Sequence, residues 1–404
     1  MGMSVKMAER RIGDEKDVLH ACDRCLTGIL GSFMKVLIAS WRCPENPRAG
    51  GAEHLTLRIA AGLVRRGHDV TWFAAGCVGL PGEVVIDGVR IVRRARQGSV
   101  HAYFAIWLKR VDLQHNHFDV IVDQVNTIPF LAHWHTNLPT VAFFHQLARE
   151  VWFYEAGWFT ARAGFAMEPI YLKPYRQVPL ITDSRSSLLS LREIGLLGSA
   201  SVIPMAIDPP GSSVPDVAFM ATTLRLVITC RLVQSKRVDH ALRTVALLYR
   251  RGLPVSIDIV GSGLPGVVGA LKKLASHLHV DHVVRFHGRL STDERDRVIA
   301  SAFVIIGVSV REGWGLSITE ANALCVPGAV YPVPGLCDST IHDQTGVISL
   351  DATPPSLADA IERLWRDEDL YRACRAGARA FASGLTWDRT VLAFEEALVS
   401  VVRG

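Results

Sequence analysis

Several features that would place a chain among membrane-spanning or nucleic-acid-binding proteins are missing from this sequence. No apolar run in its 404 residues reaches the length of about 20 residues that is needed to cross a bilayer. The run "LTGILGSFM", from Leu26 to Met34, is too short and is followed at once by Lys35, and no signal peptide is predicted. No block of lysine and arginine is long enough to form an arm that binds nucleic acid. These absences favour a globular, cytosolic protein.

Motifs for metal ligation are also missing. No HExxH or similar spacing occurs among the 15 histidines. The eight cysteines are scattered, which fits a protein whose thiols stay reduced. The close pair Cys22 and Cys25 in "CDRC" has only His20 nearby, whereas a zinc site normally needs a second ligand pair. The sequence therefore predicts neither a bound metal nor another cofactor.

What the sequence does contain is typical of a globular enzyme. Hydrophobic residues make up 49% and charged residues 21%, and the length suits two or three domains. The net charge of +5 is a mild basic excess. It fits a preference for anionic small molecules or for anionic membrane surfaces.

Strand and helix patterns alternate in two halves of similar size, which predicts an α/β fold of parallel βαβ units. We expect an extension over residues 1–33, a first Rossmann-like domain over 34–205, a linker rich in Pro, Gly and Ser over 206–221, a second Rossmann-like domain over 222–385, and a last helix over 386–404. Open parallel sheets bind ligands beyond the carboxyl ends of their strands, so two such halves predict a ligand cleft between them.

The stretch "VSVREGWGLSITEA" places two carboxylates around a glycine turn. Gly313 and Gly315 permit close approach of the backbone, and a helix that starts at Ser317 would offer free N–H groups to a phosphate. Glu312 and Glu320 could then accept hydrogen bonds from the hydroxyls of two rings flanking a diphosphate. The alternative is structural: Ser317 and Glu320 match a capping box, and Glu312 would be a solvated loop acid.

Two further turns carry groups suited to an anionic ligand. Arg231 and Lys236 follow the first strand of the second half, where α/β units present phosphate-binding groups, although a solvated basic loop is the simpler alternative. In "RAGGAE", Gly50 and Gly51 would let the backbone touch a substrate, and Glu53 lies at the favourable start of a helix.

Ring-bearing residues leave two interpretations open. His145 follows a strand and could contact a sugar hydroxyl, but an isolated histidine is more often a buried structural residue. The aromatic stretch over residues 145–165 could line an acceptor pocket or dock on a membrane. Packing in the core is the preferred interpretation of that stretch.

The segment "VGSGLPG", residues 260–266, supports a different enzyme class. It matches G-x-G-x-x-G after a strand, with Asp281 downstream, as in nicotinamide dinucleotide sites. Pro265 and the position of the segment on an internal strand count against that match. An NAD-dependent oxidoreductase is therefore kept as the alternative function.

Taken together, residues 34–400 resemble the retaining glycosyltransferases of family 4, which have the GT-B fold. The resemblance rests on Glu312–x7–Glu320 within "EGWGLSITEA", together with "RLVQSK" and "GGAE". It implies an enzyme, a hexosyltransferase. The sequence departs from the family pattern at Met205-Ala206, where Asn-Gly is usual, and at Asp338, where Glu is common.

The resemblance also implies a role for each matching position. Glu312 would bind the donor sugar, Glu320 the ribose, and Arg231 and Lys236 the diphosphate. The nucleobase would be contacted near Leu290, Gly51 would approach the donor, and His145 would lie beside the reacting sugar. The phosphates would be covered by the backbone of Gly313, Trp314, Gly315 and Leu316.

The chemistry implied by the resemblance is transfer from a UDP- or GDP-hexose with retention and without a metal. The acceptor would be a glycan, a lipid carrier or a natural product, and not a nucleic acid. The last helix would cross back to the first domain, and the enzyme would be cytoplasmic, with possible peripheral contact at the inner membrane face. A sugar-nucleotide epimerase with the GT-B fold is a second alternative.

Overall fold

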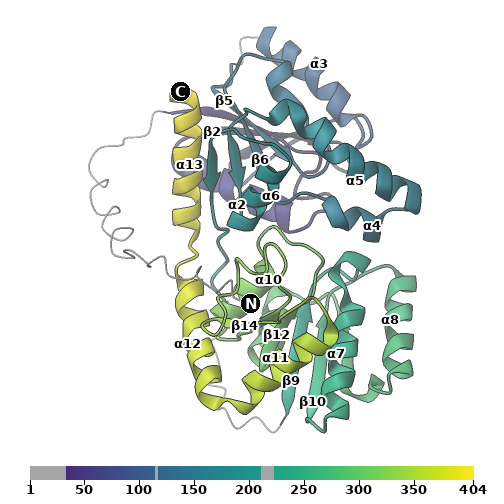
Figure 1. The fold of residues 1–404 in the computed structure, drawn as a ribbon. Helices are drawn as coiled ribbons and strands as arrows, with labels where there is room; N and C mark the ends of the chain where they lie inside the picture. Colours follow the sequence, from purple (N-terminus) through teal and green to yellow (C-terminus); the bar gives the residue numbers. More distant parts are fainter. Residues whose placement is uncertain (1–32, 114–116, 211–222) are drawn as a thin grey trace, which may run out of the picture.

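The computed structural model describes residues 33–113, 117–210 and 223–404, which form two α/β domains stacked one above the other (Figure 1). Residues 1–32 of the expected extension over 1–33, with Cys22 and Cys25, lie outside the described residues, as do residues 211–221 of the expected linker. No helix in the described ranges is both long enough and apolar enough to cross a membrane.

The N-terminal domain is built on an eight-stranded sheet in the order β3-β4-β2-β1-β5-β6-β7-β8. All neighbouring strands are parallel except β3 and β4. Its elements are β1 (Lys35–Ala39), α2 (Gly51–Arg65), β2 (Asp69–Ala75), β3 (Glu83–Ile86), β4 (Val89–Arg94), α3 (Val100–Leu113), β5 (Val120–Val125), η1 (Ala132–Trp134), β6 (Thr140–Phe144), η2 (Arg149–Val151), α4 (Trp152–Glu155), α5 (Trp158–Leu172), η3 (Lys173–Tyr175), β7 (Leu180–Thr182), α6 (Arg185–Glu193) and β8 (Ala200–Val202).

Both faces of the central strands are buried, as the continuous apolar run of β1 predicts. Val36 and Ile38 belong to the hydrophobic cluster that includes residues of α2. Leu37 and Ala39, one position along, belong to the cluster that includes residues of α3 on the opposite face. The hairpin of β3 and β4 was not predicted, because Glu83, Arg90 and Arg94 interrupt its apolar pattern at this sheet edge.

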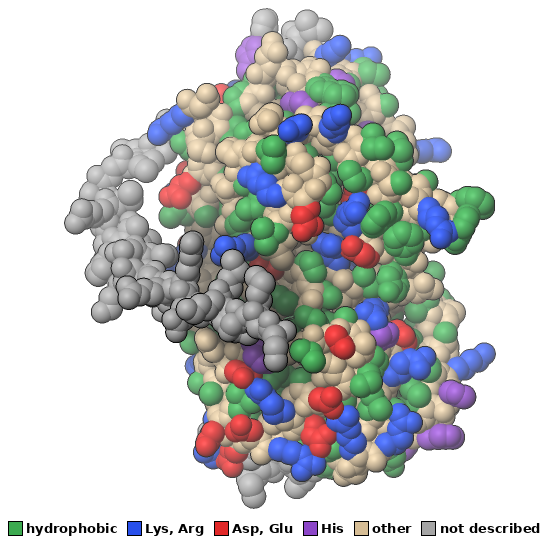
Figure 2. All heavy atoms as spheres, viewed as in Figure 1, with side chains coloured by type: hydrophobic (Ala, Val, Ile, Leu, Met, Phe, Trp, Pro, Cys, Tyr) green, Lys and Arg blue, Asp and Glu red, His purple; other side chains and the backbone are tan. Residues whose placement is uncertain are grey.

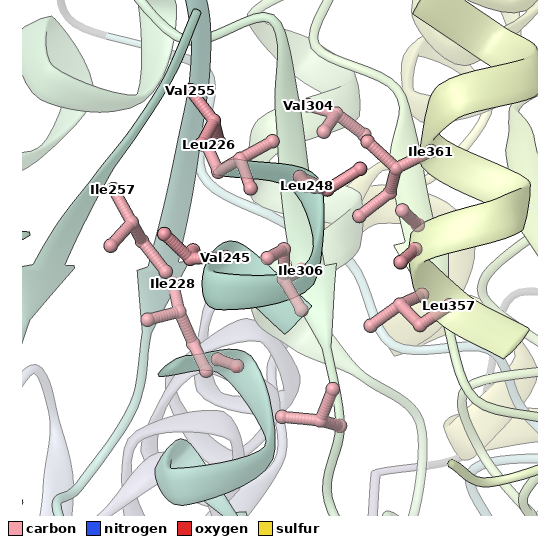
Figure 3. Close-up of a cluster of buried hydrophobic side chains, with 14 of the residues drawn as sticks. Leu226, Ile228, Val245, Leu248, Val255, Ile257, Val304, Ile306, Leu357 and Ile361 are labelled. Atoms are coloured by element: carbon pink, nitrogen blue, oxygen red, sulfur yellow. The ribbon is translucent and has the colours of Figure 1, made fainter. Parts of the chain in front are cut away.

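The C-terminal domain contains a six-stranded parallel sheet in the order β11-β10-β9-β12-β13-β14. Its core lies between this sheet and helices that include α7 and α11 (Figure 3). Its elements are β9 (Leu224–Thr229), η4 (Gln234–Lys236), α7 (Val238–Arg250), β10 (Val255–Val260), α8 (Pro265–His277), η5 (Asp281–Val283), β11 (Val284–Gly288), α9 (Thr292–Ala300), β12 (Val304–Gly307), α10 (Leu316–Ala323), β13 (Gly328–Val330), β14 (Gly346–Ile348), α11 (Pro354–Arg366) and α12 (Glu368–Ser383).

A final helix, α13 (Trp387–Arg403), leaves the C-terminal domain after α12 and runs along the N-terminal domain (Figure 1). Phe394 is buried against Phe143 of β6, with ring centroids 5.4 Å apart. Glu395, also buried, accepts a hydrogen bond from His68 Nε2 at 2.9 Å and pairs with Arg66. The Met34 N–H donates to His68 Nδ1, so the ring proton is on Nε2. The helix is therefore an integral part of the N-terminal core.

Candidate active site in the interdomain cleft

The two domains share a cleft at the carboxyl ends of their strands. Its volume is about 510 Å³, within the range of about 300–1,000 Å³ that is usual for ligand pockets. The loops that line it follow β1, β5 and β6 in one domain and β9 and β12 in the other. The order of the strands changes direction between β1 and β5 in the N-terminal sheet and between β9 and β12 in the C-terminal sheet. Ligands of open parallel sheets bind at such switch points, so the topology identifies this cleft as the candidate site.

Nine of the eleven residues to which the family resemblance assigns a role line this cleft. They come from α2, from the loop after β6, from the loop after β9 and from the turn before α10. These residues are Gly51, His145, Arg231, Lys236, Glu312, Gly313, Trp314, Gly315 and Leu316. Glu320 and Leu290 are not among the described residues that line it.

An ion pair links the two turns of the C-terminal domain. Lys236 Nζ donates to Glu312 Oε1 at 2.5 Å, and Ser309 Oγ donates to the same oxygen at 2.6 Å. The side chains of Lys236 and Glu312 are about one-fifth exposed, so neither is a freely solvated loop charge. Arg231 is exposed and lines the same cleft. Glu312 is therefore held in place, with its second oxygen left for a ligand.

The glycine turn is required by the close approach of the two domains. Gly315 has φ of 94° and caps the N-terminus of α10, a backbone conformation that glycine adopts without strain. A Cβ atom on Gly313 would lie 2.5 Å from the carbonyl oxygen of His145, and one on Gly51 would lie 3.2 Å from Leu316. Larger residues at Gly313 would push the domains apart.

Trp314, between the two glycines, is buried and belongs to the hydrophobic cluster of the N-terminal domain. Its ring stacks on Phe381 of α12, with centroids 6.4 Å apart. The indole therefore helps to join the domains, and the turn that carries it forms part of the cleft lining.

Glu320 does not cap its helix. The helix begins at Leu316 with Gly315 as the N-cap, so the capping-box interpretation of Ser317 and Glu320 is wrong. Instead, Glu320 Oε1 accepts a hydrogen bond from Arg295 Nη1 at 3.1 Å, and Arg295 is also held by Asp296. Burial raises the pKa of Glu320, and the charge of Arg295 opposes that shift. Leu290 packs at the edge of the hydrophobic cluster that contains residues of α9 and α10.

His145 is held by two buried partners that the sequence interpretation did not identify. Its Nδ1 lies 2.7 Å from Asp183 Oδ2, and its Nε2 lies 2.8 Å from Gln124 Nε2. Gln124 Nε2 also donates to Thr56 Oγ1 at 2.8 Å. Because an amide nitrogen can only donate, His145 Nε2 accepts and Nδ1–H donates to Asp183. The imidazole is thus fixed in one tautomer and one orientation at the cleft wall.

A sequence signal for these partners was present. Gln124 lies in β5, His145 follows β6 and Asp183 follows β7, and these strands are neighbours in the sheet. Polar residues at the carboxyl ends of adjacent parallel strands converge. In the sequence, "FDVIVDQ" and "PLITDS" show only the short apolar runs of strands, and without the strand order their polar ends could not be assigned to one site.

The cleft lining contains arginines beside acids, together with buried polar atoms that have no hydrogen-bond partner among the described residues. Burial lowers the pKa of Arg42, as do the charges of Arg231 and Arg48, whereas Glu53 opposes the shift. Within the described residues, several buried polar atoms of the cleft lining have no hydrogen-bond partner: Trp41 Nε1, Arg42 Nε, Asn126 Nδ2, Gln146 Oε1, Asp183 Oδ1 and Trp314 Nε1. Such atoms are rare in packed cores, so their concentration here favours a ligand-binding site, and the four nitrogens among them could donate to an anionic ligand.

Contacts across the cleft join the domains close to these groups. Arg311 donates to Glu150 Oε2 at 2.9 Å and to Ser190 Oγ at 3.0 Å. Ser235 donates to Glu155 of α4. Asp338, where the family pattern has Glu, accepts from the backbone of Ser186 at 3.2 Å and from its hydroxyl.

The remaining candidates do not form a second site. In "VGSGLPG", a Cβ on Gly261 would lie 1.8 Å from the carbonyl oxygen of Cys230, and Gly263 forms a bridge with Leu232. These glycines are therefore needed for packing between two loops. Burial raises the pKa of Cys230 to about 12, so its thiol is protonated at neutral pH. Among the described residues, no group of three or more His, Cys, Asp or Glu side chains is placed to hold a metal ion.

The aromatic stretch does not pack as expected. Phe153, Tyr154, Trp158 and Phe159 are exposed on α4 and α5, so the preferred interpretation of core packing is wrong for these four residues. Sequence alone did not show that α5 packs against the rest of the domain with only one side, which buries Ala161 and Leu172.

Comparison with known proteins gives one consistent result. The family model described as "Glycosyltransferase Family 4" matches residues 49–210, and the model described as "Glycosyl transferases group 1" matches residues 220–381. An uncharacterized glycosyltransferase of Methanocaldococcus jannaschii is 26% identical over 366 residues, covering 83% of this chain and 90% of the relative. Curated D-inositol 3-phosphate glycosyltransferases match over 33–42% of their own length.

Solved structures share the fold over nearly the whole chain. Sucrose-phosphate synthase from Thermosynechococcus elongatus superposes with a TM-score of 0.75 at 17% identity, covering 92% of this chain and 99% of that one. HepE of Anabaena, solved with UDP and glucose, has a TM-score of 0.69 at 19% identity and covers 91% of this chain and 100% of that one. These matches do not favour an oxidoreductase or an epimerase.

Proposed function

Because the chain belongs to family 4 of the glycosyltransferases and has their GT-B fold, as the sequence predicted, we propose that it moves a hexose from a nucleotide-diphosphate sugar to a hydroxyl acceptor with retention of configuration. The observation that carries this proposal is the Lys236–Glu312 pair, which lies in the interdomain cleft beside the N-terminus of α10.

The diphosphate is proposed to lie on the N-terminus of α10. The first N–H groups of a helix have no partner within the helix and carry partial positive charge, so they attract anions. Arg231 and Lys236 add two cations on the neighbouring turn. These charges would stabilise the negative charge that develops on the diphosphate as the sugar leaves.

The sugar is proposed to lie between Glu312 and His145. Lys236 and Ser309 occupy one carboxylate oxygen of Glu312, which leaves the other to accept from a sugar hydroxyl. The ribose is proposed to extend toward Glu320. Glu320 is ordered by Arg295 and lies one helical turn beyond Leu316 on α10.

Transfer would break the bond between the anomeric carbon and the diphosphate oxygen and form a bond from the acceptor oxygen to the same carbon. The acceptor proton would pass to the leaving diphosphate oxygen, which lies on the face that the acceptor approaches. We propose that no metal and no enzyme nucleophile take part. The contacts across the cleft would keep water from the reacting centre.

Donor binding can be measured by thermal unfolding. A ligand at one hundred times its dissociation constant adds about 2.7 kcal/mol to the free energy of unfolding, or about 5–10 °C in Tm for a domain of this size. We expect this shift with one member of a panel of UDP- and GDP-sugars, equally in EDTA and in magnesium.

Two results of this screen would count against the proposal. One is stabilisation by NADH without stabilisation by any nucleotide sugar. The other is conversion of the bound donor to another nucleotide sugar when no acceptor is added, which would indicate an epimerase. Analysis of the product anomer tests retention separately.

Replacing Asp183 by asparagine should loosen the orientation of His145. The carboxylate that accepts from Nδ1–H is lost, and misplacement of about 1 Å at a reacting centre can cost about a hundredfold in rate. We expect kcat to fall about tenfold or more, while the donor-induced Tm shift is retained, because the diphosphate contacts are untouched.

Asp258 provides a matched control for Asp183. It is also a buried aspartate bonded to a histidine, with Oδ1 at 2.6 Å from His287 Nε2, and it lies in β10, away from the described cleft lining. Asp258→Asn should lower stability but leave kcat of the folded enzyme unchanged. Equal loss of kcat in both variants would mean that Asp183 does not act by orienting His145 in the site.

A further inference from the structure

A group of exposed apolar side chains lies on α4 and α5. Six large hydrophobic side chains within 18 residues are exposed: Phe153 (50%), Tyr154 (36%), Trp158 (63%), Phe159 (80%), Met167 (48%) and Ile170 (58%). We call these six residues the α4–α5 face. Figure 2 shows hydrophobic and basic side chains together at the edge of the molecule where Figure 1 places these helices.

The exposed apolar residues of α5 lie on one side of a helix that is apolar over most of its length and only weakly amphipathic. Phe159, Ala163, Met167 and Ile170 are spaced by three or four residues on α5, so they share one side of that helix, and all four are exposed. Ala161, Glu168 and Leu172 form the buried positions of α5. With 15 residues, α5 is about 22 Å long at about 1.5 Å per residue. The helix thus turns a long apolar side to solvent.

Exposed cations lie on α5 and after its C-terminal end, and each acid of residues 149–176 contacts another part of the protein. Arg162, Lys173 and Arg176 are exposed. Among residues 149–176, Glu150 pairs with Arg311 and Glu155 accepts from Ser235, both across the cleft.

The third acid, Glu168, is buried and accepts from the backbone N–H groups of Ala148 and Arg149, each at 2.7 Å. The exposed side of α5 is therefore apolar and carries Arg162, whereas Glu155 of α4 is exposed at the side of the cleft.

We propose that the α4–α5 face docks on an anionic lipid bilayer. Tryptophan, tyrosine and phenylalanine with lysine and arginine beside them suit the interface of a membrane, where apolar rings enter the lipid and cations meet anionic headgroups. A second copy of this chain is a poorer occupant, because a symmetric contact would bring the cationic rims of both copies together. Val151 and Glu155, next to the face, line the cleft, so docking would bring the bilayer close to the site.

Co-sedimentation of the full chain with vesicles tests this proposal. We expect more binding to vesicles of phosphatidylcholine with phosphatidylglycerol than to phosphatidylcholine alone, with a decrease as salt is raised. The double variant Trp158→Ser, Phe159→Ser should bind at least about tenfold more weakly, since burial of one such ring already corresponds to about a tenfold change or more. Both rings are exposed, so the core stays intact.

Two further variants separate the contribution of the cations to binding from the effect of removing any exposed apolar side chain. Arg162→Gln with Lys173→Gln should lose about fivefold in binding per cation on the anionic vesicles only. Leu264→Ser, which removes a side chain that is 75% exposed at the start of α8 in the other domain, should bind like the wild type.

Absence of wild-type binding to either vesicle would overturn the proposal, and so would equal binding by the Trp158/Phe159 variant. Light scattering after size-exclusion chromatography tests the alternative that a second copy of the chain binds to this face. A wild-type dimer that the same double variant dissociates would assign the face to contact between copies instead.

Discussion

Replacing Glu312 by glutamine is expected to lower kcat about a hundredfold or more on a donor that the wild-type enzyme accepts. The substitution keeps the size of the side chain but removes the charge that Lys236 and the proposed sugar hydroxyl both use. Loss of one preorganised polar group at a reacting centre typically costs a factor of about 10²–10³. Lys236 would also lose its ionic partner beside the diphosphate. The measurement is steady-state transfer with kcat and KM determined separately.

Glu362 is the matched control for this experiment. Its side chain is as exposed as that of Glu312 and also pairs with a cation, Arg251, at 2.8 Å, but it lies on α11. Glu362→Gln should leave kcat unchanged. Wild-type kcat/KM in Glu312→Gln would refute the site, because this prediction depends on the charge of Glu312 and not on its shape.

Truncation of Phe394 to alanine should be among the most destabilising single changes in the N-terminal domain. Phe394 is 1% exposed and packs edge-to-face on Phe143 of β6. Removal of a fully buried phenylalanine usually costs about 3–5 kcal/mol, because both the transfer free energy and a cavity contribute. We expect the urea midpoint of the N-terminal domain to fall accordingly, and α13 to become accessible to proteases.

Leu392 on the same helix provides the comparison. It is 42% exposed, so Leu392→Ala should change the free energy of unfolding by no more than about 0.5 kcal/mol. Similar midpoints for the two variants would mean that α13 does not carry the N-terminal core. Both proteins should be followed by near-UV circular dichroism as well, since the two domains can unfold separately.

Local patterns in the sequence were sufficient to predict the parallel α/β architecture and the donor-side motif. Buried parallel strands are continuous apolar runs, so β1, β6, β9 and β12 can be recognised from their local sequence. The Glu312 turn was recognisable because the strand, the two glycines and the helix start are contiguous in sequence. A capping box at Ser317 and Glu320 matched the same local pattern, and only the geometry of α10 and Arg295 distinguished the two interpretations.

Features that depend on tertiary neighbours could not be predicted in the same way. The grouping of His145, Asp183 and Gln124 requires the order of β5, β6 and β7 in the sheet. The exposure of Trp158 and Phe159 was missed because an aromatic residue is normally expected to be buried. Whether it is buried depends on what packs against the helix, and that information is not local.

The return of α13 to the first domain has a consequence for biosynthesis. On the ribosome, β1 to β8 emerge well before α13, so the nascent N-terminal sheet has to wait while the whole second domain is translated. During that interval the side chains of Phe143 and His68 lack their partners on α13, and apolar surface exposed in this way is what chaperones bind. We therefore expect the core of the N-terminal domain to be completed last, because a chain that ends before Trp387 lacks Phe394 and Glu395.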